Sequence, residues 1–237
     1  IFGFNTKIFS YYEYYLLKVM KKKVFYINFG SDSRPPFLDG ARIRSDYRFK
    51  INSIYKQNKR KKKTMRIIEK NSDVILSYPP MAHYYCNRKI NLMVLGIPFA
   101  SNIDLVDDQL NSTMENKIRI LHAPSDEHVK GSIIIRSIIK TLIEKGYPIE
   151  YKEVIGMKNS VVLDELRKCD FVIDQLWSDT PMAKFATEAA FFGKPAVVGG
   201  YYAAVIHDEI GEEYIPPSLF VRPDEVETAV EKMISDH

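Results

Sequence analysis

The stretch Thr180–Gly200, TPMAKFATEAAFFGKPAVVGG, predicts a helix, a glycine stop and a buried strand that ends in two glycines. Either Thr180 or Asp179, which directly precedes the stretch, can cap the helix. Pro181 suits the first helical position, and Gly193 suits the position after the last turn. Glu188 is the one carboxylate inside this helix, among apolar and small residues. We therefore expect Glu188 to have a functional role.

Strand and helix patterns alternate on both sides of this stretch, which is typical of parallel sheets flanked by helices. The further expected strands are residues 24–29, 73–78, 92–99, 117–123, 147–155, 171–177 and 219–221. The further expected helices are residues 9–23, 46–71, 132–146 and 159–170, with a last helix from Asp224. We therefore expect an α/β protein whose second half is Rossmann-like.

The chain of 237 residues is long enough for two domains of about 100 residues, each with its own core. Residues 1–100 hold 20 basic and 6 acidic side chains, a net charge of +14, whereas residues 101–237 hold 14 and 24, a net charge of −10. We expect domains at 1–100 and 117–237, joined by a polar linker at 101–116. Because the sequence opens at Ile1 on a strand-like segment, we expect part of the first domain to precede it.

The composition also restricts location and partners. No apolar run reaches the length of a membrane span, and no secretory signal is visible. Cys86 and Cys169 lie far apart without metal-ligand spacing, so we expect buried, reduced thiols and a cytoplasmic location. The basic half favours an anionic partner, but no nucleic-acid-binding motif accompanies the charge. We therefore expect a membrane face or a phosphorylated acceptor, and no nucleic acid.

The segment HAPSDEHVKG, residues 122–131, separates an expected strand from an expected helix. Open α/β sheets bind ligands beyond the carboxyl ends of their strands, and the free N–H groups at a helix start favour phosphate. Lys130 and Gly131 stand at that helix start, so Lys130 is a candidate for binding a diphosphate. The alternative is a solvent-exposed loop lysine. His122 is expected to be hydrogen bonded within the fold, with a position in the ligand cleft as its alternative.

Glu188 is a candidate for binding a vicinal diol such as a ribose, because its carboxylate can accept two hydrogen bonds. Asp179, Thr180 and Pro181 begin the expected helix, and the first free N–H groups of that helix could also meet a phosphate. The alternative for Glu188 is a helix-surface ion pair, since Lys184 stands four residues before it.

The segment GSDSRP, residues 30–35, directly follows an expected strand. Gly30 permits a tight turn, and Asp32 can accept hydrogen bonds from sugar hydroxyls. Arg34 can bind a phosphate through two parallel hydrogen bonds. The alternative is an Asx-type turn followed by a solvated arginine.

These motifs, taken in order, resemble retaining GT-B glycosyltransferases of the family-four type. The resemblance to the C-terminal domain lies in RILHAPSDEHVKGSIIIRSIIKTLIEKG (119–146), DELRKCDFVIDQL (164–176) and FATEAAFFGKPAVV (185–198). The resemblance to the acceptor domain lies in VFYINFGSDSRP (24–35) and NSDVILSYPP (71–80). It implies two Rossmann-like domains that face a cleft, the N-terminal one incomplete in this chain.

The resemblance also implies an activity, transfer of a hexose from a nucleotide-diphosphate sugar to a glycan or lipid-linked acceptor with retention of configuration. Lys130 would contact the diphosphate and Glu188 the ribose, with Ser125, Gly131 and Thr180 in the same donor site. On the acceptor side the resemblance places Gly30, Ser31 and Arg34, with Asp32 as the candidate catalytic residue. The chain has no D-x-D triplet and no metal-ligand spacing among its histidines, so we expect no metal and no cofactor.

Three positions depart from the family pattern. Thr180 stands where the family commonly has a second glutamate, Glu127 where it often has a basic residue, and Phe29 where it often has a histidine. Thr180, Phe29 and the expected incompleteness of the N-terminal domain favour the alternative of a non-catalytic nucleotide-sugar-binding or scaffold protein of the same fold. A sugar-nucleotide epimerase of GT-B shape is a further alternative, but its catalytic carboxylates and histidines cannot be placed.

The basic run at residues 56–63 falls on an expected helix, and Lys21–Lys23 form a second basic run. Nearby aromatic residues are Tyr11, Tyr12, Tyr14 and Tyr15. We expect either a solvated basic face or peripheral contact with an anionic membrane at its cytoplasmic side.

Overall fold

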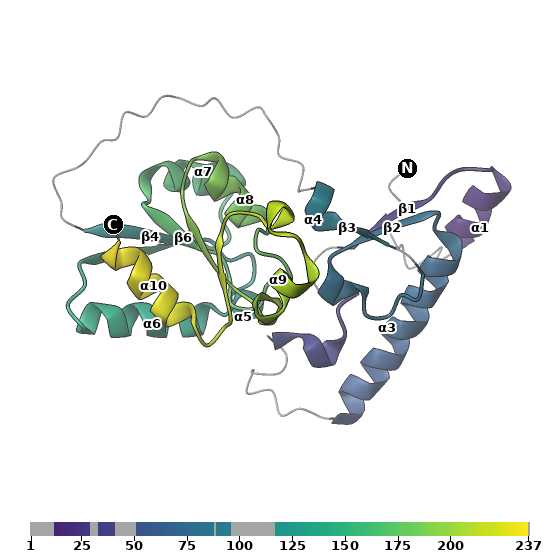
Figure 1. The fold of residues 1–237 in the computed structure, drawn as a ribbon, viewed down its shortest axis with the longest axis horizontal. Helices are drawn as coiled ribbons and strands as arrows, with labels where there is room; N and C mark the ends of the chain where they lie inside the picture. The colour runs from purple at the N-terminus through teal and green to yellow at the C-terminus, as the bar shows by residue number, and fades with distance from the viewer. Residues whose placement is uncertain (1–11, 29–32, 41–50, 88, 96–116, 237) are drawn as a thin grey trace. The chain divides into compact units, whose positions relative to one another are not determined.

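The computed structural model describes residues 12–28, 33–40, 51–87, 89–95 and 117–236. The chain divides into two compact units, Ile1–Leu95 and Gly96–His237. Within the described residues, the first unit has a three-stranded parallel sheet and the second a five-stranded parallel sheet, both accompanied by helices (Figure 1). The expected α/β class is therefore confirmed. The helices described are all too short or too polar to traverse a bilayer.

The first unit has the strand order β1-β2-β3. Its elements are α1 (Tyr12–Val19), β1 (Phe25–Ile27), η2 (Pro36–Leu38), α3 (Ile51–Asn71), β2 (Val74–Ser77), η3 (Pro79–Ala82), β3 (Ile90–Asn91) and α4 (Leu92–Leu95). Met65 and Ile68 of α3 pack with Ile75 of β2 in one core cluster, and Tyr14 of α1 packs against it. One side of α3 therefore covers the sheet. Most of its lysines are exposed, whereas Lys61 is half-buried and donates to the carbonyl oxygen of Arg34 at 3.0 Å.

The strand expected at residues 92–99 is wrong in its described part. Leu92–Leu95 form the helical turn α4, and the strand β3 ends at Asn91. The Asn91 side chain accepts a hydrogen bond from the backbone N–H of Met93 at 3.0 Å. Such a side-chain bond to the backbone favours a turn over a continued strand. Residues 96–99 lie outside the described residues.

The second unit has the strand order β5-β4-β6-β7-β8. Its strands are β4 (Ile118–His122), β5 (Ile149–Glu153), β6 (Phe171–Ile173), β7 (Ala196–Gly199) and β8 (Leu219–Val221). Its longer helices are α6 (Ser132–Glu144), α7 (Asn159–Lys168), α8 (Lys184–Phe191) and α10 (Val226–Ser235). The short helical pieces are α5 (Glu127–Lys130), η4 (Tyr201–Ala204), α9 (Ile206–Glu209) and η5 (Glu212–Tyr214).

Helices lie on both faces of the second sheet (Figure 1). On one face, Leu121, Val172 and Val198 share a core cluster with residues of α7 and α8. On the other, Lys145 at the end of α6 lies 3.2 Å from Glu227 of α10, which ties these two helices together. Burial on both faces explains why β6 and β7 consist of apolar residues and glycine.

Helix α8 begins at Lys184, later than the expected start at Thr180 or Pro181. The Ser178 hydroxyl donates to the carbonyl oxygen of Thr180 at 2.6 Å, and its oxygen accepts from the Thr180 N–H at 3.2 Å. This local turn occupies backbone groups that a helix would need. The helix start expected at Asp179 to Pro181, with its N–H groups open to a phosphate, is therefore wrong in position. Gly193, with φ of +68°, follows the end of the helix as expected.

Candidate functional site

The second sheet has a topological switch point between β4 and β6. After β4 the chain forms β5 on one side, and it then places β6 on the other side of β4. In open parallel sheets a crevice forms at such a point, outside the carboxyl ends of the strands, and ligands bind there. The segments that follow β4 and β6, residues 123–131 and 174–183, are therefore the candidate site.

The segment after β4 is held in a defined shape by Asp126 and Gly131. The Asp126 carboxylate accepts hydrogen bonds from the N–H groups of His128 at 2.9 Å and Val129 at 3.0 Å, and so caps α5. Gly131 has φ of +80°, and a Cβ there would lie 2.7 Å from Cδ1 of Leu176. The segments after β4 and β6 therefore touch at a position that only glycine fits without strain.

Lys130 is the last residue of α5, and its ammonium group faces the end of β6. Its Nζ lies 3.2 Å from Oδ1 of Asp174, and the two side chains are 17% and 1% exposed. The Gln175 amide nitrogen donates to the other Asp174 oxygen at 3.4 Å. Lys130 is therefore not a solvent-exposed loop lysine. It is the counter-charge of a buried carboxylate at the end of the central strand.

Asp174 is the site residue that the sequence reasoning missed. A usable signal was present, because Asp174 directly follows three fully buried strand residues, and a charge that enters the interior needs a partner. That partner stands 44 positions away in the chain, so no local spacing could identify it.

The end of β7 holds the segment after β6 by backbone contact. Ser178 donates its N–H to the carbonyl oxygen of Gly199 at 2.8 Å, and Gly199 donates to that of Gln175 at 2.7 Å. A Cβ on Gly199 would lie 2.8 Å from the carbonyl oxygen of Leu176, and one on Gly200 would collide with that of Ser178. The two glycines therefore allow the polar segment at residues 174–181 to be buried against the sheet.

Glu188 lies on the core side of α8, and it is 4% exposed. Its neighbours Phe185 and Ala189 belong to the same apolar cluster as the sheet residues. Oε1 of Glu188 is 3.6 Å from Nζ of Lys184, whose side chain is 74% exposed. In the part of the chain that the structure describes, nothing donates a hydrogen bond to the Glu188 carboxylate. The ion pair considered as the alternative does form, but its carboxylate is buried and not on the surface.

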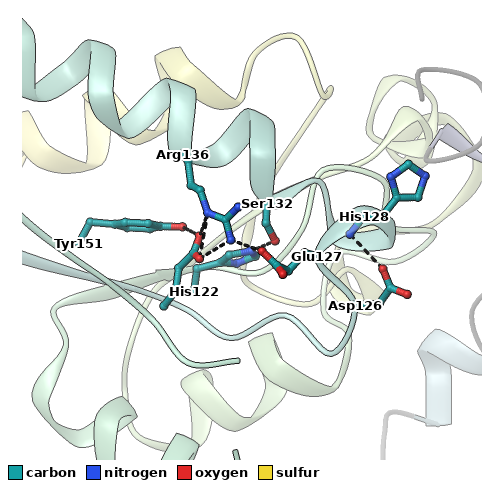
Figure 2. Close-up of polar contacts among 8 residues, drawn as sticks. His122, Asp126, Glu127, His128, Ser132, Arg136 and Tyr151 are labelled. Carbon is teal, nitrogen blue, oxygen red and sulfur yellow. Dashed lines mark hydrogen bonds and ion pairs between the residues drawn. The ribbon is translucent and has the colours of Figure 1, made fainter. Parts of the chain in front are cut away.

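A second charged cluster lies beside the candidate site (Figure 2). Arg136 of α6 donates from Nε to both oxygens of Glu153 at 3.0 Å, and it also pairs with Glu127 of α5. Tyr151 donates to Glu153 at 2.6 Å. Hydrogen bonds to Glu153 and Glu127 raise the pKa of Arg136. Burial opposes ionisation of Glu153, but hydrogen bonds from Arg136 and Tyr151 outweigh it and lower its pKa.

This cluster changes the expected electrostatic effect of Glu127, which stands where the resemblance implies a basic residue. The Arg136 guanidinium compensates the Glu127 charge. Glu127 therefore offers less repulsion to an anion in the crevice than its sequence position indicated. The same contact joins α5 to α6 and, through Glu153, to the end of β5.

His122 has a structural position at the end of β4. It is fully buried, with Nδ1 2.7 Å from the carbonyl oxygen of Ile173 and Nε2 2.8 Å from Oγ of Ser132. The carbonyl oxygen can only accept, so Nδ1 carries a proton, and burial favours the neutral ring, in which Nε2 accepts from the Ser132 hydroxyl. Burial lowers the pKa of His122. Both ring nitrogens are thus used by the fold, as expected for a histidine hydrogen bonded within it.

Most predicted acceptor-side residues cannot be placed. Gly30, Ser31 and Asp32 lie outside the described residues, as does Phe29. Arg34 is described and is 8% exposed, so it is not a solvated arginine. Its Nη1 lies 3.5 Å from Oδ1 of Asp39 in the same unit.

The remaining predicted donor residues have different settings. Ser125 is exposed on the segment after β4, whereas Thr180 is buried in the turn with Ser178. Of the two cysteines expected to be buried, Cys169 is buried, but Cys86 is exposed, so the expectation is wrong for Cys86. The described residues contain no group of three His, Cys, Asp or Glu side chains that could hold a metal ion. No protein-family model matches the chain, and no curated protein matches it. The family resemblance of the motifs therefore stays a prediction.

Proposed function

We propose that the chain is a glycosyltransferase that moves a hexose from a nucleotide-diphosphate sugar to a glycan or lipid-linked acceptor, with retention of configuration. The observation that carries this proposal is the buried carboxylate of Glu188, to which no described residue donates a hydrogen bond. Lys184, at 3.6 Å, is its one described ion-pair partner and lies beyond hydrogen-bond distance, so a ligand that supplies donors would stabilise this largely buried charge. The two hydroxyls of a ribose are such donors.

Lys130 supports a diphosphate as the second part of the ligand. Its ammonium group carries three hydrogens, and the contact with Asp174 uses one of them. The others remain for phosphate oxygens while the charge of Asp174 stays compensated. During transfer the bond between the sugar and the diphosphate breaks, and negative charge grows on the leaving phosphate. A fixed ammonium group stabilises that charge more in the transition state than in the ground state.

The proposed acceptor side lies in the first unit, where Asp32 would be the catalytic candidate and Gly30, Ser31 and Arg34 would shape the acceptor site. This assignment is carried by the resemblance alone. Arg34 is held by Asp39, so it would take part as a positioned group with a compensated charge.

The test is turnover, measured as release of UDP or GDP from their hexose conjugates in the presence of lipid and glycan acceptors. We expect metal-independent release that falls at least about tenfold in Glu188→Gln, because two charge-assisted hydrogen bonds to the ribose are weakened. The control is Glu144→Gln, which changes an exposed glutamate on α6. Equal rates in both variants would contradict the proposed role of Glu188.

One observation favours a second candidate function, a nucleotide-sugar-binding protein without turnover. Thr180 stands where the family commonly has a sugar-contacting glutamate, and its backbone is held in the Ser178 turn. In this case the chain would bind a nucleotide in a Glu188-dependent manner and release none from any hexose conjugate. Binding and turnover measured on one preparation separate the two candidates.

A further inference from the structure

Helix α1 of the first unit carries large apolar side chains on its outer side. Tyr15, Leu16 and Val19 are 57%, 61% and 79% exposed, and Met20 directly after the helix is 53% exposed. Leu16, Val19 and Met20 have the i, i+3, i+4 spacing that places side chains on one side of a helix. Soluble helices normally place such a stripe towards the core.

The opposite side of α1 is the one that contacts the unit. Tyr14 packs against the core cluster that contains Met65 and Ile68 of α3. Lys18 donates from Nζ to the carbonyl oxygen of Lys70, at the end of α3, at 3.0 Å. Figure 1 shows α1 beside this end of α3. The helix is therefore fixed with its apolar stripe outward.

Three lysines directly follow this apolar stripe in the sequence. Lys21, Lys22 and Lys23 are exposed, and Lys70 of α3 is exposed beside α1. Lys23 pairs with Asp73 at 3.1 Å, whereas Lys21 and Lys22 have no ion pair or hydrogen bond from their side chains among the described residues. Apolar side chains next to uncompensated lysines are the pattern of helices that lie in the interface of an anionic bilayer.

We propose that α1 and the turn after it, residues 15–22, bind the surface of a membrane that contains anionic lipid. Leu16, Val19 and Met20 enter the boundary between headgroups and acyl chains, and Lys21 and Lys22 contact lipid phosphates. This contact is independent of nucleotide binding in the second unit.

The lysines beside this face favour a bilayer over a protein as its partner. The buried centres of protein interfaces are depleted in lysine, whereas anionic lipid attracts each lysine near its surface. Helix α3 alone would not serve, because Tyr55 is its one large apolar side chain with high exposure among those described. The membrane contact expected for residues 56–63 together with Lys21–Lys23 is thus centred on α1 and the turn after it, with α3 adding long-range charge. Tyr11 lies outside the described residues, and Tyr14 faces the core.

The test is co-sedimentation of the full chain with vesicles of phosphatidylcholine, with and without phosphatidylglycerol. We expect binding to the anionic vesicles only. The paired variant Lys21→Gln/Lys22→Gln should bind about 30-fold more weakly, roughly fivefold for each lysine. The paired variant Leu16→Gln/Val19→Gln should bind at least about tenfold more weakly, because apolar area no longer enters the bilayer. All four positions are exposed, so these variants are expected to fold.

The control is Ile133→Gln/Met157→Gln, which removes two similarly exposed apolar side chains from the second unit and should bind like the unchanged chain. The proposal is overturned if the unchanged chain ignores anionic vesicles, or if loss of Leu16 and Val19 leaves binding unaltered. It is also overturned if the chain self-associates in solution and the Leu16→Gln/Val19→Gln variant becomes monomeric, since a second copy would then cover this face.

Discussion

Asp174 and Lys130 form an ion pair, so the effect of replacing one residue on stability depends on whether the other is still present. Lys130→Met leaves Asp174 buried without a counter-charge, so we expect the free energy of unfolding to fall by about 3 kcal/mol. Asp174→Leu leaves a lysine that can still turn to water, and it should cost less. The double variant replaces both partners by apolar groups and should recover most of the loss. Urea unfolding of the three variants measures this coupling. If the loss in the double variant equals the sum of the two single losses, the contact between Lys130 and Asp174 does not contribute to stability.

The neutral state of His122 makes stability depend on pH. Burial lowers its pKa below the ordinary 6.5, so the unfolded chain binds this proton at a higher pH than the folded chain. The contribution is therefore complete above pH 6.5 and is lost as the pH falls below that value. Glu153 and Glu165 have pKa values lowered from 4.5, so their losses begin at more acidic pH.

We expect His122→Gln to flatten the dependence of unfolding free energy on pH just below 6.5, because the titrating group is gone. The matched change His207→Gln, at an exposed histidine, should keep the slope. Urea unfolding at several pH values checks both. A slope that persists in His122→Gln would assign the titration to another group.

At the residue scale the sequence allowed some site residues to be predicted. Lys130 and Glu188 could be proposed because each stands beside a recognisable strand end or helix. The burial of Glu188 agrees with its apolar surroundings in the sequence. Asp174 could not be paired with Lys130, since that contact exists only once β4 and β6 are neighbours in the sheet. Pairing by tertiary structure has no local sequence signal.

At the element scale, Gly131 joins α5 to α6 and touches the segment after β6. Gly131→Ala adds a Cβ both at positive φ and against Leu176. Gly146→Ala meets the same backbone problem, with φ of +96°, but has no atom within 4 Å of the new Cβ. We expect Gly131→Ala to be less stable than Gly146→Ala by about 1–3 kcal/mol, the ordinary cost of overpacking. Thermal and urea unfolding measure the difference, and equal losses would show that Leu176 moves aside freely.

Element positions were predictable where apolar periodicity was strong and less so at turns. β4 and β6 and the helices α6 and α7 fall within their expected ranges, because buried strands and amphipathic helices leave clear patterns. The start of α8 was wrong because Ser178 bonds to the backbone of Thr180. The strand expected from Leu92 was wrong because Asn91 caps a helical turn. In both cases a short polar side chain competed locally with regular structure.

At the scale of the whole molecule, the described residues form two parallel sheets, one in each of two units. The alternation of strands and helices made this organisation predictable. In our account the second unit binds the nucleotide at its switch point, and the first unit meets the acceptor and an anionic membrane.

The central claim is that Glu188 and Lys130 belong to a nucleotide site in the second unit. Calorimetric titration of the chain with UDP and with GDP, without metal and again with Mg²⁺, tests it directly. We predict metal-independent binding of one nucleotide that weakens at least about tenfold in Glu188→Gln, while that variant unfolds at the same or higher urea concentration, since a buried charge has been removed. If neither nucleotide binds, or if Glu188→Gln binds like the unchanged chain, the claim is contradicted.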